Sequence, residues 1–175
     1  PAPVDLGNGV ITNQMGISIP AQLNYRHTSE SRAVFGQVTF RPTDKLSLTG
    51  GLRYTEDRKH LDQTASIARN NHAKFSQINW AVSADYKFSD DILGYLRVTT
   101  GYKSGGFNPR SVGGSFDPEK IISYEAGLKT ELLDRRLRLN LTAFHARYKD
   151  LQVSQFMAGS GGASSITVNA GKATY

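Results

Sequence analysis

The sequence has no cysteine among its 175 residues. That absence excludes disulfides, thiol catalysis and zinc or iron–sulfur sites with cysteine ligands, although it does not fix the compartment. The sequence also has no apolar run approaching the roughly 18 residues that a membrane-spanning helix needs. Residues 1–20 lack the basic start and apolar stretch of a signal peptide. We therefore expect neither a helical membrane protein nor an intact secretory leader.

The sequence also lacks a dense cluster of positive charge that would indicate a particular binding partner. Lys and Arg number 21 against 15 Asp and Glu, a net charge of +6, yet the densest basic cluster is only Arg135, Arg136 and Arg138. Positive charge spread in this way is compatible with nucleic acid or with an anionic membrane surface. The 8 Phe, 8 Tyr and 1 Trp argue against disorder. The length fits one domain.

What the sequence does contain is alternation with a period of two. From Gln77 to Phe88 the even positions are apolar or aromatic and the odd positions are mostly polar. Successive side chains of a strand point to opposite faces, so this pattern predicts a strand whose two faces meet different environments.

The same alternation recurs along the chain. It covers residues 33–41, 46–55, 94–103, 122–132 and 137–142. Residues 165–175 predict one more strand, and residues 17–25 a weak earlier one that contains Pro20. The phase slips at residues 144–148, for which a β-bulge is the simplest explanation. We expect residues 1–30 to form an extracellular loop with at most that weak strand, and residues 31–175 to form the sheet.

The connections alternate in length. Tight turns are predicted near residues 42–45, 89–91 and 133–136, and long polar loops near residues 56–74, 104–118 and 150–164. An all-β, antiparallel up-and-down meander of about seven or eight long strands, with short turns on one rim and long loops on the other, is typical of a transmembrane β-barrel. A soluble sandwich also alternates, but its strands are usually about 5 or 6 residues long. The pattern therefore favours a partial segment of a transmembrane barrel, with periplasmic turns and extracellular loops.

Several short motifs occur in an order that resembles the TonB-dependent outer-membrane receptors. They are Phe35-Gly36-Gln37, residues 43–55, residues 101–108, residues 116–119, residues 123–129, Phe144, residues 148–152 and residues 169–172. The resemblance implies a barrel of about 22 strands in the bacterial outer membrane, with an N-terminal plug energised by the TonB complex. It implies import of iron–siderophore complexes, cobalamin or other scarce nutrients. Because no plug-like segment or TonB box is present, we interpret the chain as an internal slice of such a receptor.

Basic residues on the polar face suggest how a solute would be attracted. Arg53, Arg97, Lys103 and Lys129 fall on that face, which in a barrel is the lumen. A cationic lumen would concentrate anionic nutrients such as ferric siderophores. The alternative is that these cations pair with Asp85, Glu125 and Glu131 across strands.

Loop residues complete the predicted ligand-binding set. Aromatic and polar groups at Tyr102, Phe107, Asn108 and Arg110 lie in or beside a glycine-rich loop that can close over a guest. The predicted ligand-binding residues are Arg53, Arg97, Tyr102, Lys103, Phe107, Asn108 and Arg110.

Enzyme chemistry finds no support in the sequence. No catalytic elbow or phosphate loop is complete, and His60 and His72 are interpreted as solvated loop residues rather than ligands of a metal-bearing guest. We expect no catalytic residue, no metal site, no cofactor and no nucleic-acid partner. Two alternatives remain: a complete small eight-stranded barrel with a structural or adhesive role, and a soluble sheet protein that binds nucleic acid or sugar.

Overall fold

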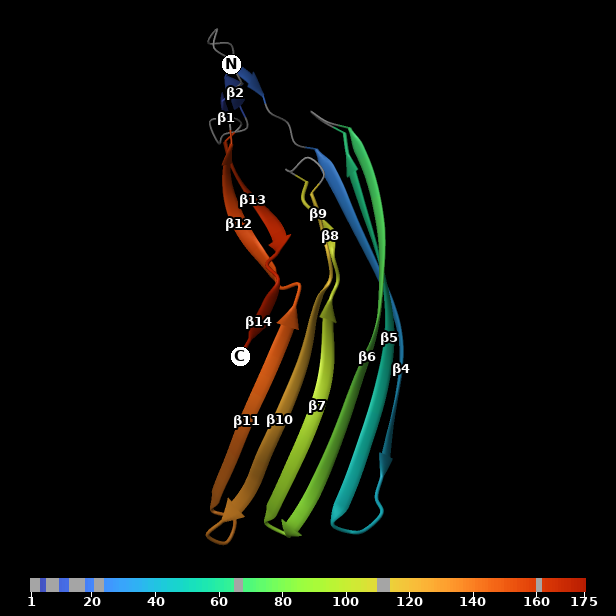
Figure 1. Cartoon of the computed structure of the whole chain (residues 1–175), viewed down its shortest axis with the longest axis vertical. Coiled ribbons are helices and arrows are strands. Elements are labelled where there is room, and N and C mark those ends of the chain that lie inside the picture. The colour runs from blue at the N-terminus through green and yellow to red at the C-terminus, as the bar shows by residue number, and fades with distance from the viewer. Residues whose placement is uncertain are drawn as a thin grey trace.

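A computed structural model of the chain describes residues 4–5, 10–12, 18–20, 24–64, 68–109, 114–159 and 162–175. Within these residues all regular structure is β-strand, and no helix is long and apolar enough to cross a membrane. Seven strands form one antiparallel sheet in the order β14–β11–β10–β7–β6–β5–β4 (Figure 1). They are β4 (Tyr25–Phe40), β5 (Leu46–Gln63), β6 (Arg69–Ser89), β7 (Ile92–Lys103), β10 (Glu119–Leu132), β11 (Leu137–Lys149) and β14 (Lys172–Thr174). The predicted antiparallel meander is confirmed.

Three small sheets accompany the large one. They are β1 (Val4–Asp5), β2 (Val10–Thr12) and β3 (Ser18–Pro20); β8 (Gly106–Phe107) with β9 (Ser115–Phe116); and β12 (Gln152–Gly159) with β13 (Gly162–Asn169). The hairpins β8–β9 and β12–β13 interrupt the meander after β7 and β11. Among the described strands β4 and β14 form the two edges of an open sheet. This arrangement differs from the closed ring that the eight-stranded alternative requires.

The two rims differ as the connection lengths predict. The tight turns at residues 41–45, 90–91 and 133–136 lie together at the bottom of Figure 1, and the hairpins β8–β9 and β12–β13 lie toward the top. We call these the short-turn end and the long-loop end. The assignment of the short-turn end to the periplasm remains a prediction.

Four local expectations differ from the structure. The boundary at residue 31 falls inside β4, which begins at Tyr25. Residues 56–74 are mostly paired strand rather than loop, because β5 continues to Gln63 and β6 begins at Arg69. Residues 150–164 hold β12 and the start of β13, whereas residues 165–175 divide between β13 and β14 around Gly171, whose φ is +69°.

The bulge expected at residues 144–148 is the fourth difference. The β10–β11 ladder is continuous from Lys120 opposite Lys149 to Leu132 opposite Leu137. Phe144 simply lies on the polar face, opposite Glu125. An irregular register occurs instead between β6 and β7, at Lys87 and Ser89.

The apolar face of the sheet is not covered by protein. Leu52 is 62% exposed, Tyr86 43% and Trp80 37%, and the only buried apolar side chains among the described residues are Leu61 and Ala146. On β5 this face is apolar or glycine from Leu46 to Tyr54 and charged from Glu56 onward. That length is close to the roughly 9–11 residues of a tilted strand crossing the hydrocarbon of a bilayer. We call this face the outer face, its apolar part the apolar band, and the opposite face the inner face.

The β6–β7 ladder ends part-way up the sheet. Its last pair toward the long-loop end is Ala81 opposite Thr99. Immediately beyond, the Thr100 hydroxyl accepts a hydrogen bond from the Trp80 amide (2.8 Å) and donates one to the Trp80 carbonyl (3.1 Å). A side chain therefore satisfies the β6 backbone where the next strand leaves it.

Candidate functional site

The inner face carries the four cations that the alternation predicts. The register places Arg53, Arg97, Lys103 and Lys129 there, on β5, β7, β7 and β10, and all four are exposed. The structure does not gather them at one point. Arg53 lies opposite Asn79 and Arg97 opposite Ser83, so β6 and four residues of its length separate them.

None of these four cations has a carboxylate within ion-pair distance in the part of the chain that the structure describes. The Arg53 Nε donates to Thr55 Oγ1 (3.1 Å), and its guanidinium lies 5.8 Å from the centre of the Phe35 ring. Lys129 Nζ lies 5.5 Å from the Tyr95 ring centre. These contacts orient the cations without neutralising them.

The carboxylates of the inner face are occupied by neutral donors or by other cations. Tyr95 Oη donates to Glu125 (2.7 Å), and Ser83 lies 3.4 Å from Asp85. Glu131 pairs with Arg135 and Arg138 near the short turn. Among the described residues, none of the four inner-face cations forms a direct ion pair with Asp85, Glu125 or Glu131, so the expected pairing does not occur as salt bridges. The ladder nevertheless places Arg97 directly opposite Glu125 and Lys103 opposite Glu119, so cations and carboxylates are interspersed on the inner face.

The Tyr95 side chain links neighbouring strands of the inner face near these cations. It lies over Gly127, its cross-strand partner, where a methyl group would overlap the ring. Its hydroxyl reaches across β10 to within 3.2 Å of Thr142 Oγ1 on β11. One aromatic side chain thus spans three strands, because glycine leaves it room.

Tyr102 lies beyond the apolar band, at the long-loop end of β7, and is tied to β5. Its hydroxyl donates to Asp57 Oδ2 (2.6 Å), and Asp57 is buried. Burial, and then the hydrogen bond to the Asp57 carboxylate, raise the pKa of Tyr102, so the hydroxyl remains a neutral donor. Three residues on, a side chain at Gly105 would clash with Phe75 on β6. The glycine-rich loop is thus packed against the inner face of β5 and β6, and Asp57 is a partner that sequence reasoning missed.

Asn108 is buried and has a structural contact rather than a free amide. Its side-chain nitrogen donates to the Thr167 carbonyl (2.7 Å), and its oxygen accepts from the Thr167 amide (2.9 Å). The side chain therefore acts like a strand neighbour for β13. Phe107 is half-buried on β8, and Arg110 lies outside the described residues.

Two further amides join the same two hairpins. Asn169 accepts from the Asp117 amide (2.7 Å) and donates to the carbonyls of Asp117 (2.9 Å) and Asp150 (2.8 Å). Gln152 donates to the carbonyls of Ser104 (3.0 Å) and Asp117 (3.1 Å), and its backbone amide donates to Glu119 (2.8 Å). We call Asn108, Gln152 and Asn169 the amide clamp. All three lie in the motifs that carry the family resemblance, a signal that could have identified them.

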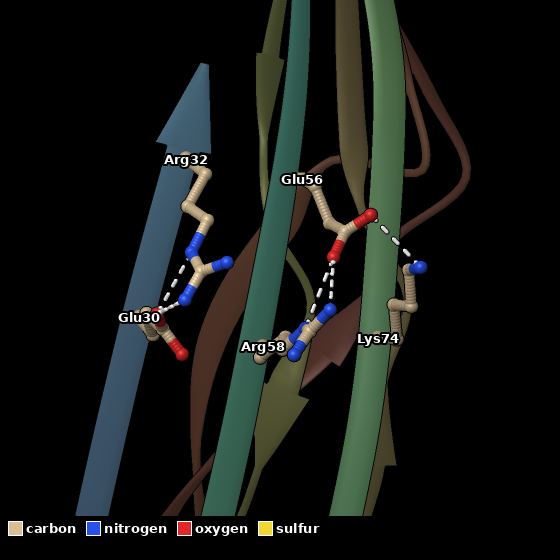
Figure 2. A network of polar contacts seen from close by, with 5 residues as sticks. All are labelled: Glu30, Arg32, Glu56, Arg58 and Lys74. Atoms are coloured by element: carbon tan, nitrogen blue, oxygen red, sulfur yellow. Dashed lines mark hydrogen bonds and ion pairs between the residues drawn. The ribbon is translucent and has the colours of Figure 1, made fainter.

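On the outer face, charged residues begin just beyond the apolar band of β4, β5 and β6. Figure 2 shows five of them, which we call the charged belt: Glu30, Arg32, Glu56, Arg58 and Lys74. Arg32 pairs with Glu30 (2.6 Å), while Glu56 pairs with both Arg58 (2.8 Å) and Lys74 (2.8 Å). The hydrogen bonds from Lys74 and Arg58 lower the pKa of the Glu56 carboxyl. Every cation of the belt thus has a carboxylate partner.

His60 and His72 face each other farther along the same hairpin, with ring centres 3.9 Å apart. His60 Nε2 lies 2.7 Å from Asp62 Oδ2. Among the described residues, no group of three or more His, Cys, Asp or Glu side chains could hold a metal ion.

Comparison with known proteins explains this architecture. The family model for the TonB-dependent receptor-like β-barrel matches residues 3–175. The chain belongs to the TonB-dependent receptor β-barrel family. The pesticin receptor of Yersinia enterocolitica is 30% identical over 155 residues, which are 83% of this chain and 22% of that protein.

Solved receptor barrels have the same fold as this TonB-dependent receptor chain. The crystal structure of the ferric yersiniabactin uptake receptor FyuA from Yersinia pestis matches with a TM-score of 0.69 and 28% identity, over 86% of this chain and 23% of that one. The siderophore receptor PiuA from Acinetobacter baumannii matches with a TM-score of 0.67 and 20% identity, over 86% and 22%. The chain therefore spans less than a quarter of these relatives, each of which is named a receptor.

Proposed function

We propose that this chain forms part of the lumen wall of an outer-membrane receptor that takes up iron–siderophore complexes or similar scarce nutrients. The observation that carries the proposal is the inner face, where Arg53, Arg97 and Lys103 are exposed and form no direct ion pair among the described residues. The relative at 28% identity is named a ferric yersiniabactin uptake receptor, which supports an iron complex as the guest.

The proposed role is binding and guidance, without catalysis. Exposed cations without direct ion pairs on the wall of the lumen attract an anionic ferric siderophore and slow its escape. At the long-loop end, Lys103 and Phe107 supply a cation and an aromatic ring, beside the Tyr102 ring that Asp57 holds in place. Asn108 contributes indirectly, by holding β8 beside β13. A plug and the TonB complex, both supplied from outside this chain, would energise passage through the barrel.

The test is substitution of two inner-face arginines in the whole receptor. We expect Arg53→Gln with Arg97→Gln to lower the affinity for an anionic ferric siderophore about tenfold, and to weaken its dependence on salt. Equilibrium binding of the radiolabelled iron complex to purified receptor measures the first effect, and the same binding repeated at increasing salt concentration measures the second.

A matched control uses arginines of the outer face. Arg32→Gln with Arg58→Gln removes the same charge from residues that face away from the lumen. This variant should bind the guest normally. Equal affinity of the wild type and the inner-face variant would reject the proposed steering.

A further inference from the structure

Three lysines stand in one cross-strand row on the outer face. Lys120 on β10 lies opposite Lys149 on β11, which lies opposite Lys172 on β14. Arg147 lies two residues from Lys149 on the same face, opposite Ile122 and Thr174. All four cations are exposed. We call them the lysine row.

The lysine row is unfavourable for the protein alone. Like charges directly opposite one another on an antiparallel ladder destabilise it. In the described part of the chain, no carboxylate lies within ion-pair distance of these four residues. Among the described residues, the one polar side-chain contact of these four is the hydrogen bond that Arg147 Nε donates to His145 Nε2 (3.3 Å). Charge of the opposite sign must therefore come from outside this sheet.

The position of the row indicates where that charge lies. On β10 the outer face runs from Leu132 at the short turn to Ile122, a length close to the roughly 9–11 residues that cross the hydrocarbon. Tyr124, whose ring stacks on His145 with centres 6.4 Å apart, lies near the end of that span. Lys120 is the next outer-face residue after Ile122. The row therefore lies at the depth of lipid headgroups, at the long-loop end.

We propose that the lysine row binds the phosphate groups of phosphorylated lipids in the leaflet at the long-loop end. Ammonium groups are strong point-charge partners for phosphate, and flexible lysine stems let them reach headgroups beside the apolar band. Spacing over three adjacent strands suits a headgroup that carries more than one phosphate. The inference rests on the outer-membrane barrel and is independent of the nutrient that the receptor takes up.

The experiment compares two triple variants of the whole receptor in nanodiscs. Lys120→Gln, Lys149→Gln and Lys172→Gln together should reduce the amount of bisphosphorylated lipid A retained from mixed lipids about tenfold or more at physiological salt. The matched control, Arg32→Gln, Arg58→Gln and Lys74→Gln, removes the same number of charges from the charged belt. It should retain lipid A nearly as the wild type does.

A stability measurement gives a second, independent readout. In discs of neutral lipid, the lysine-row variant should unfold at a temperature equal to or above that of the wild type, because repulsion has been relieved. In discs that contain lipid A the order should reverse. Unchanged lipid retention, an equal loss in the control variant, or no reversal would overturn the proposal. Inorganic phosphate that stabilises the wild type as well as lipid A does would show a free-phosphate site and reject the lipid assignment.

Discussion

The charged belt and the lysine row both lie just beyond the apolar band on the outer face, but they differ in how their positive charges are compensated. In the belt, Glu56 holds Arg58 and Lys74 through ion pairs of 2.8 Å. In the row, Lys149 stands between Lys120 and Lys172 without a carboxylate partner in the described residues. The belt is complete within three strands, whereas the row is stable only beside external negative charge. Where the compensating charge comes from distinguishes a structural surface from a binding surface.

The long-loop end repeats this contrast with hydrogen bonds. The β5–β6 hairpin extends through backbone pairing and ion pairs, whereas β8–β9 and β12–β13 are joined by the neutral amide clamp. Ion pairs weaken in salt, whereas buried neutral hydrogen bonds are largely insensitive to it. The two groups of hairpins should therefore respond differently to the same perturbation.

The largest expected effect comes from breaking the amide clamp. Asn169→Ala removes three hydrogen bonds and leaves the Asp117 and Asp150 backbone groups without their side-chain partner. We expect a local loss of about 2–3 kcal/mol. Hydrogen exchange should accelerate in β8–β9 and β12–β13 and stay unchanged in β5–β6. Asn70→Ala, at an exposed position of β6, is the control; equal protection in both variants would show that the clamp holds nothing.

A smaller effect should follow from introducing a carboxylate into the lysine row, so that its cations are paired as those of the charged belt are. Lys149→Glu places a carboxylate between Lys120 and Lys172. It should raise stability in neutral detergent by up to about 1 kcal/mol through two new cross-strand pairs, while abolishing retention of phosphorylated lipid. Chemical unfolding followed by tryptophan fluorescence measures the gain. A loss of stability in neutral detergent would mean that the row is not repulsive.

The smallest effect should come from protonating Glu56 at low pH, which removes the negative charge that pairs with Arg58 and Lys74 in the charged belt. The ordinary pKa of Glu56 is 4.5 and the fold lowers it. A lowered pKa means that its contribution to stability is fully present above pH 4.5 and is lost as the pH falls through the folded-state value. Within that window Arg58 and Lys74 should gain affinity for phosphorylated lipid. Glu56→Gln should bind the lipid equally across this pH range, and a pH response that persists in that variant would assign the effect to another group.

The sequence predicted the strands that cross the apolar band, because lipid and water on opposite faces impose a period of two. It failed for residues 56–63 and 69–74, where both faces are polar and the stabilising pairs, such as Lys74 with Glu56, join residues whose register cannot be read from one strand. Phe144 interrupts the alternation because it is an aromatic residue on the polar face, and the ladder there is continuous without a bulge. The cationic inner face was predictable by alternation, whereas the partners of Tyr102 and Asn108 lie 45 and 59 residues away in the chain.

The Thr100 hydroxyl satisfies the Trp80 backbone at the point where β7 separates from β6, and this affects which changes in loop length the sheet can tolerate. Beyond Ala81 and Thr99 no ladder hydrogen bond links β6 to β7 in the described residues. The Thr100 side chain contacts the Trp80 backbone of β6, and the Tyr102 hydroxyl reaches Asp57 on β5. Insertions or deletions at the tip of the β5–β6 hairpin, beyond Asp57 and Phe75, should therefore break no β6–β7 ladder hydrogen bond and leave the contacts of Tyr102 and Gly105 in place. The hairpin β5–β6 and the loops after β7 can then differ in length while the sheet below them keeps the same strand pairing.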